Sequence, residues 1–184
     1  MFKGSEVGRV GAYKYLGVWV SEGGGWAEMV KQMVAKGKKS VSELGKVLWN
    51  KEVSVEVKMR LWEAVGESRM KYGSEVWWAD KAQQRGLARV ELEWGKKVLG
   101  VGKSTSDVFV RGELGLRRVV AKGEEMRLRW LGRLVVMRAS SWPKKVFEVE
   151  WEKKVGVGGL RRRGWKVVSE RLVKKYGLLS LIHI

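Results

Sequence analysis

The sequence WAEMVKQMVAKGKKSVSELGKVL, residues 26–48, decides the fold class of this chain. Apolar and small residues recur in it every three or four positions, which is the period of one face of an α-helix. That face consists of Trp26, Val30, Met33, Gly37, Val41, Leu44 and Leu48. The stretch therefore predicts a long amphipathic helix, and the fold around it is predicted to be mainly α.

Two further amphipathic helices are predicted on the C-terminal side. Each follows a residue whose side-chain oxygen can accept a backbone N–H at a helix start, Ser54 in one case and Asp80 in the other. The first carries a stripe of Ser54, Val57, Leu61, Val65, Ser68 and Tyr72 and runs into Glu75-Val76-Trp77-Trp78. The second carries Leu87, Val90, Trp94 and Val98.

The segment Gly100-Val101-Gly102-Lys103-Ser104-Thr105 has the composition of a phosphate-binding loop but lacks its context. A P-loop needs a glycine five residues before Gly102, where this chain has Lys97, and it follows a buried strand. We predict instead a helix C-cap followed by Ser104 as the next N-cap, with Asp107 completing an approximate capping box. A short helix through Val108 to Leu114 follows.

The remaining C-terminal sequence predicts three more helical stretches. The first carries Val120, Met126, Trp130, Leu131, Leu134 and Val135. Pro143 marks the first turn of the second, since proline is tolerated there, and the last ends near Tyr176-Gly177. The predicted segments are a hairpin at 1–21, a helical bundle at 22–100, a helical connector packed on the bundle at 101–140, a basic helical tail at 141–177 and a non-native apolar tail at 178–184.

The N-terminal segment predicts a β-hairpin. Residues 7–20 form two short strands, with Gly8 and Gly11 turning the chain before a strand over Tyr13–Val20. In Tyr13-Lys14-Tyr15-Leu16-Gly17-Val18, alternation would place Tyr13, Tyr15 and Gly17 on one face of a half-buried core strand. The same aromatic, basic and glycine residues also suit a segment that grips a nucleic-acid strand. The sequence of this strand fits both a half-buried core strand and a segment that binds nucleic acid.

Composition narrows the class of partner. The chain has 184 residues, one proline, 45% hydrophobic and 32% charged residues, a balance typical of a folded, helix-rich protein. Its net charge of +18 indicates a polyanionic partner, with nucleic acid the leading candidate. A membrane surface would also attract this charge, but scattered glutamates interrupt the basic faces, so no membrane partner is expected.

Other classes of protein are disfavoured by what the sequence lacks. It has no cysteine, and His183 is its only histidine, so neither a disulfide framework nor a thiolate zinc site is expected. The first residues do not read as a signal peptide, and no run of residues is apolar enough to span a bilayer. We expect an intracellular protein, nuclear or cytoplasmic, that is not secreted.

Several blocks of sequence, taken in order, resemble the C-terminal region of a non-LTR (LINE-type) retrotransposon reverse transcriptase. These blocks are Tyr13 to Val18, Lys71-Tyr72-Gly73-Ser74-Glu75-Val76-Trp77, Lys97-Val98-Leu99-Gly100-Val101, Gly112-Glu113-Leu114-Gly115-Leu116 and Leu128-Arg129-Trp130-Leu131-Gly132-Arg133-Leu134. The resemblance covers about residues 10 to 175. It extends to Gly159-Leu160-Arg161-Arg162-Arg163-Gly164-Trp165, similar to the family's basic tail, although Leu160 replaces a usual proline.

The resemblance implies a palm-derived primer grip in the hairpin and a thumb-like arrangement in the helices after it. The aspartates that hold two Mg²⁺ ions in this family lie upstream of the primer grip, so the resemblance implies that this chain alone is not an enzyme. Its only aspartates, Asp80 and Asp107, have capping roles, and Glu91 with Glu93 and Glu124-Glu125 are interpreted as solvated helix faces. The implied partners are an RNA template, a DNA primer and the missing palm.

The resemblance also implies which residues bind nucleic acid. Tyr13, Lys14, Tyr15, Leu16 and Gly17 would contact the primer 3′ end, with glycine letting the backbone approach a phosphate. Lys36, Lys38 and Lys39 fit equally a solvated helix face and a helix that tracks a duplex. Arg161, Arg162 and Arg163 with Lys166 are predicted phosphate contacts, and Trp165 is a base-stacking candidate. Trp26, Trp94 and Trp130 are predicted to be core residues.

Two alternatives remain open: a free-standing basic helical nucleic-acid-binding protein, and a non-functional remnant of a decayed element. The second is motivated by seven glycines inside predicted helices. They are Gly37, Gly45, Gly66, Gly86, Gly95, Gly123 and Gly132. Each costs roughly 1 kcal/mol relative to alanine, so their total is on the order of the whole stability of a domain. Such a chain is stable only if close packing through those glycines compensates.

Overall fold

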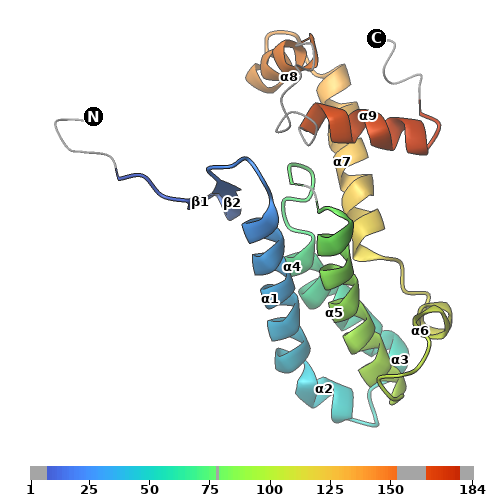
Figure 1. Cartoon of the computed structure of the whole chain (residues 1–184). Coiled ribbons are helices and arrows are strands. Elements are labelled where there is room, and N and C mark those ends of the chain that lie inside the picture. Colours follow the sequence, from blue (N-terminus) through green and yellow to red (C-terminus); the bar gives the residue numbers. More distant parts are fainter. Residues whose placement is uncertain (1–7, 78, 153–164, 179–184) are drawn as a thin grey trace.

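The computed structural model describes residues 8–77, 79–152 and 165–178 and confirms a mainly helical chain opened by a two-stranded hairpin (Figure 1). Arg161, Arg162, Arg163, His183 and most of the tail 178–184 lie outside the described residues, so the predictions for them are not addressed by the structure. The elements are β1 (Ala12–Tyr15), β2 (Val18–Ser21), α1 (Ala27–Glu43), α2 (Gly45–Trp49), α3 (Val55–Leu61), the π-helical segment η1 (Trp62–Glu67), α4 (Ser68–Met70), α5 (Lys81–Leu99), α6 (Asp107–Leu114), α7 (Val119–Val136), α8 (Trp142–Glu152) and α9 (Trp165–Lys175).

The hairpin turns at a different place from the one predicted. β1 and β2 pair antiparallel, with Tyr15 opposite Val18, so the turn consists of Leu16 and Gly17 and the predicted single strand over Tyr13–Val20 is wrong. Both turn residues have positive φ, 46° and 85°, which is the geometry of a type I′ turn. Such a turn matches the right-handed twist of the two strands, and this explains why the chain reverses there rather than at Gly8 or Gly11.

The core forms where α1 lies beside α5 (Figure 1). Val30, Met33, Gly37 and Val41 of the predicted face of α1 are buried, and Met29, which was not predicted, is buried beside them. The predicted face of α5 is fully confirmed, since Leu87, Val90, Trp94 and Val98 are all buried. The long helix is interrupted at Leu44, after which α2 brings Leu48 back to the core.

The second predicted helix buries a different face from the one expected. Lys58, Trp62, Glu67 and Met70 are buried, whereas Val57 and Tyr72 are exposed. The helical run also ends at Met70, before Trp77. Trp62 explains the change, because its indole stacks on that of Trp94 with ring centroids 5.2 Å apart, and an aromatic pair of this size outweighs the burial of smaller aliphatic side chains.

The helix ends follow the predicted capping chemistry in three places of four. The Ser54 side chain accepts a hydrogen bond of 3.3 Å from the Val57 N–H at the start of α3. The Asp80 side chain accepts hydrogen bonds from the backbone of Ala82 and Gln83 and forms a full capping box at the start of α5. Gly100 ends α5 in the left-handed conformation. The prediction of Ser104 as the next N-cap is wrong: α6 follows Ser106, and Asp107 pairs with Lys96 Nζ at 2.9 Å.

The C-terminal helices attach to the rest of the chain through α7 (Figure 1). Leu131 and Leu134 of α7 are buried, as are Leu172 and Val173 of α9, which packs on α7. At the C-terminal end of α7, Lys144 of α8 donates to the Val135 carbonyl over 2.8 Å. Such a bond satisfies one of the carbonyls that a helix C-terminus leaves open.

Four of the seven predicted helix glycines lie in tight contacts. A Cβ atom on Gly37 would lie 2.5 Å from Met70 Sδ, one on Gly66 would lie 2.2 Å from the Trp62 ring, and one on Gly95 would lie 2.8 Å from a Val110 methyl. Gly123 packs on the Ser74 side chain in the same way. These glycines allow close packing of neighbouring groups, which is the compensation that a stable chain of this composition needs.

The predicted tryptophan core is only partly confirmed. Trp94 is fully buried, while Trp26 and Trp130 are half-buried. Trp26 packs against the edge of the core. Exposed tryptophans also occur, at Trp49 and Trp142.

Candidate nucleic-acid interface

The hairpin tip projects side chains into solvent. Tyr13 and Tyr15 are each 63% exposed and Leu16 is 76% exposed. Burial in this hairpin comes instead from β2, where Val18 and Trp19 pack against the core. The interpretation of Tyr13 and Tyr15 as core residues is therefore wrong, and two tyrosine rings are free to contact another molecule.

Tyr72 fixes the hairpin tip to the helical core. Its phenol donates a hydrogen bond of 3.1 Å to the Leu16 carbonyl, across 56 residues of sequence. Its ring also lies against Gly17, where a Cβ atom would be 2.8 Å from Tyr72 Cε1. Glycine at position 17 thus serves both the positive φ of the turn and this close approach. The contacts with Tyr72 therefore fix the position of the exposed tip.

Positive charges from three elements meet beside Tyr72. Lys36 Nζ of α1 lies 5.8 Å from the centroid of the Tyr72 ring, a cation–π distance. Burial lowers the pKa of the Lys36 ammonium below its usual value, and the charges of Lys14 on β1 and Arg69 on α4 lower it further. Two of the predicted binding groups, Lys14 and Lys36, therefore lie within electrostatic reach of each other.

The other two predicted lysines of α1 differ in position. Lys39 is exposed and lies 3.8 Å from Glu43, which also pairs with Arg69 at 2.5 Å. The hydrogen bond from Arg69 lowers the pKa of the Glu43 carboxyl. Lys38 is exposed too, but helical geometry places it about 200° around the helix from Lys36. The three lysines therefore do not form a single row.

The predicted C-terminal residues lie in a different environment. Trp165 is half-buried, and its indole N–H donates to the Glu75 carbonyl over 2.8 Å while its ring meets Phe147 edge-on. Lys166 donates to the Trp151 carbonyl and lies over the Trp151 ring. Both side chains have partners within the chain, and their predicted roles in binding stay predictions.

Two residues of this interface had no predicted role in binding. Arg69 received no role, and Tyr72 was assigned to a buried helical stripe although it is 51% exposed. A signal for Tyr72 exists, because it lies in the block Lys71 to Trp77 that carries part of the resemblance. Arg69 has no comparable signal, since its partners Ser40 and Glu43 lie more than 25 residues away.

Two of the glutamates interpreted as solvated are buried. Glu91 is fully buried and accepts hydrogen bonds from the Val119 N–H at 2.7 Å and from Arg111 at 3.3 Å. Burial outweighs these contacts and raises the pKa of the Glu91 carboxyl to about 7. Glu124 accepts from Lys175 and Tyr176 at 2.6 and 2.5 Å, and these bonds raise the pKa of both donors. Glu91 holds the start of α7 and Glu124 holds the end of α9.

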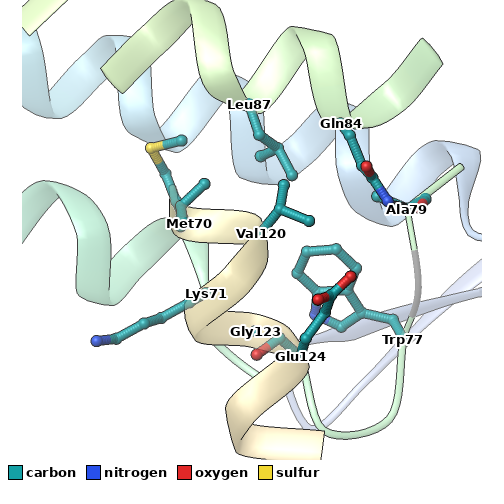
Figure 2. A pocket seen from close by; sticks show the side chains of 11 residues that line it. Met70, Lys71, Trp77, Ala79, Gln84, Leu87, Val120, Gly123 and Glu124 are labelled. Carbon is teal, nitrogen blue, oxygen red and sulfur yellow. Dashed lines mark hydrogen bonds between the residues drawn. The ribbon is translucent and has the colours of Figure 1, made fainter. Parts of the chain in front are cut away.

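A small pocket lies between the end of α4, α5 and α7 (Figure 2). Figure 2 shows Leu87, Val120 and Trp77 around this space, and the Lys71 ammonium turned away from it. Its volume of about 30 Å³ holds a water molecule, whereas ligand pockets measure roughly 300–1,000 Å³. The pocket is therefore too small for a substrate or an organic cofactor.

The described residues contain neither a metal-binding cluster nor a membrane-spanning helix. Within those residues, no cluster of three or more His, Cys, Asp or Glu side chains could hold a metal ion. No helix in the described ranges has the length and apolar character needed to cross a bilayer.

Comparisons with models of protein families, with curated proteins and with solved structures find no match to this chain.

Proposed function

We propose that this chain binds a nucleic-acid strand through the hairpin tip and the adjoining cations, without catalysing a reaction on it. The observation that carries the proposal is the pair of exposed tyrosines, Tyr13 and Tyr15, on a turn that Tyr72 fixes beside Lys14 and Lys36. Aromatic rings stack on bases of any sequence, and lysines contact phosphates. The net charge of +18 supports a polyanionic ligand.

The sequence resemblance gives this binding a more specific form. We propose that the chain is the primer-grip and thumb region of a retrotransposon reverse transcriptase, whose palm supplies the aspartates and the Mg²⁺ ions. In that setting the hairpin would hold a primer end against an RNA template. The fixed position of the exposed tip supports this form, because a primer end has to be held in one place to be extended.

Binding to labelled oligonucleotides tests the proposal. With six to eight phosphate contacts, the log–log dependence of affinity on salt should have a slope of about −5 to −7 on B-form duplex. A primer grip should also prefer a recessed primer end to a blunt duplex, whereas a free-standing basic protein has no reason to distinguish them. An affinity that does not change with salt would refute nucleic-acid binding, and equal affinity for both ends would refute the primer-grip form.

A matched pair of variants locates the binding surface. Tyr15→Ala removes an exposed ring at the hairpin tip, and Trp49→Ala removes an exposed ring from α2, at the opposite end of α1 (Figure 1). Loss of one stacked base should weaken binding by about 1–3 kcal/mol in the first variant only. An equal loss in both variants would mean that the hairpin tip is not the binding surface.

A further inference from the structure

We propose that Lys14 and Lys36 bind one and the same backbone phosphate of the nucleic-acid strand, and that Tyr72 is the positioning residue that holds them together. The inference rests on the proposed function. It adds the chemical group that is recognised, a single phosphodiester, and a residue whose role is to fix the geometry of the site.

In the described part of the chain, Lys14 and Lys36 have no carboxylate partner at ion-pair distance. The charges of Lys14 and Arg69 act on Lys36 here, and Arg69 shares the carboxylate of Glu43 with Lys39. Among the described residues, no carboxylate lies within 4 Å of Lys14 or Lys36. Two ammonium groups that are close enough to repel each other are stabilised by an anion, and a phosphate oxygen accepts from both.

Tyr72 joins the two elements that carry these lysines. Its phenol bonds to the Leu16 carbonyl on the hairpin, two residues after Lys14, while its ring lies under the Lys36 ammonium. The packing of Val18 and Trp19 on the core anchors the base of the hairpin, and Tyr72 adds the contact that fixes its tip relative to α1.

The conformation of the turn explains why it needs to be held. Leu16 has a φ of 46°, which costs a residue with a side chain roughly 1–2 kcal/mol relative to the right-handed region. Strain of this kind persists when surrounding contacts over-determine the conformation. The contacts that Tyr72 makes with Leu16 and Gly17 stabilise this turn conformation. They thereby fix the position of the strand that carries Lys14.

Phosphate interference on a short oligodeoxythymidine tests the inference. Each phosphate in turn is replaced by a neutral methylphosphonate, and affinity is measured by fluorescence anisotropy for the wild type and for Lys36→Ala. We expect one position at which the replacement weakens the wild type about 5- to 10-fold, the size expected for a charged hydrogen bond at a half-exposed site. At that position the replacement should have a smaller effect on Lys36→Ala, which keeps Lys14, and no effect on the double variant Lys14→Ala/Lys36→Ala.

A double variant distinguishes one shared phosphate from two. If one phosphate is shared, each single variant, Lys14→Ala or Lys36→Ala, leaves one lysine on it and should change the salt slope little, while the double variant should reduce the slope by about 0.7 on single-stranded DNA. A reduction of about 0.7 in each single variant and of about 1.4 in the double variant would mean that the lysines contact separate phosphates, and would overturn the inference.

Two further variants separate positioning from general stability. Tyr72→Phe keeps the ring and removes only the bond to Leu16, so the position-specific effect of the methylphosphonate should shrink while the circular dichroism spectrum is unchanged. Lys46→Ala removes an exposed lysine of α2 and should keep that effect in full. An unchanged effect in Tyr72→Phe would remove Tyr72 from the site.

The outcomes also distinguish this inference from the proposed function. Salt-dependent binding by the wild type with the same loss at every methylphosphonate position would retain nucleic-acid binding and refute the single-phosphate site. Absence of salt-dependent binding by the wild type would refute both.

Discussion

Replacing Glu91 with glutamine should remove a pH dependence from the stability of this chain. The Glu91 carboxyl is fully buried against α7 and has a pKa of about 7, compared with 4.5 for an exposed glutamate. The folded state therefore holds this proton in a pH range where the unfolded state has lost it. For a carboxyl with a raised pKa, stability is highest below the unfolded value and falls as the pH rises towards the folded value.

The size of the effect follows from the two pKa values. Each unit of difference corresponds to about 1.4 kcal/mol, so the wild type should lose about 3 kcal/mol of unfolding free energy between pH 4.5 and pH 7 through this group. Glutamine keeps an acceptor for the Val119 N–H but has no proton to lose. The stability of Glu91→Gln relative to the wild type should therefore increase by about 3 kcal/mol from pH 5 to pH 8.

Urea denaturation followed by tryptophan fluorescence measures this difference, because Trp62 and Trp94 are buried in the folded state. The control is Glu93→Gln, which changes an exposed glutamate of the same helix that pairs with Lys97. The control should show no such trend with pH. A difference between Glu91→Gln and the wild type that stays constant from pH 5 to pH 8 would refute the reasoning.

Three further predictions concern the packing, capping and turn of the fold, and each is tested by the midpoint of urea or thermal unfolding. Gly66→Ala should destabilise the folded chain by about 1–3 kcal/mol because its Cβ meets the Trp62 ring. Gly132→Ala, with open space around it, should stabilise the folded chain by about 0.5–1 kcal/mol. Equal effects of the two substitutions would contradict this account. Asp80→Ala should cost about 1 kcal/mol through loss of the capping box, and Asp80→Asn should cost little; the account is wrong if both cost the same. Leu16→Asn should stabilise by about 1 kcal/mol, since asparagine tolerates positive φ and Asn-Gly favours this turn; a destabilised variant would speak against strain at Leu16.

The helices that the sequence predicted well are those whose apolar face is continuous. The faces of α1 and α5 are regular over several turns, and they pack on each other. The helix after Ser54 shows where apolar periodicity fails to predict the buried face. Its sequence contains two candidate faces, one through Val57 and Leu61 and the other through Lys58 and Trp62. The spacing of Val57, Leu61 and Val65 matches the ideal period, but the contact of Trp62 with Trp94 decides the buried face, and the π-helical segment η1 departs from that period.

The candidate interface was predictable in its composition and not in its geometry. Tyr13, Lys14 and Tyr15 stand out in the sequence, but their exposure depends on a turn at Leu16, which is an unusual residue for positive φ. The buried state of Glu91 and Glu124 could not be predicted either. Their partners lie 20 to 52 residues away, and a helical carboxylate without a known partner is normally solvated.

The bonds between α9 and the rest of the chain have a consequence for folding during synthesis. Glu75 and Glu124 leave the ribosome long before their partners do, since Trp165 follows Glu75 by 90 residues and Tyr176 follows Glu124 by 52. During that interval the carboxylate of Glu124 has neither of its donors, and α7 lacks the apolar cover that Leu172 and Val173 provide. The nascent chain therefore passes through a stage in which its N-terminal helices can be compact while one side of α7 is open to water and to other chains.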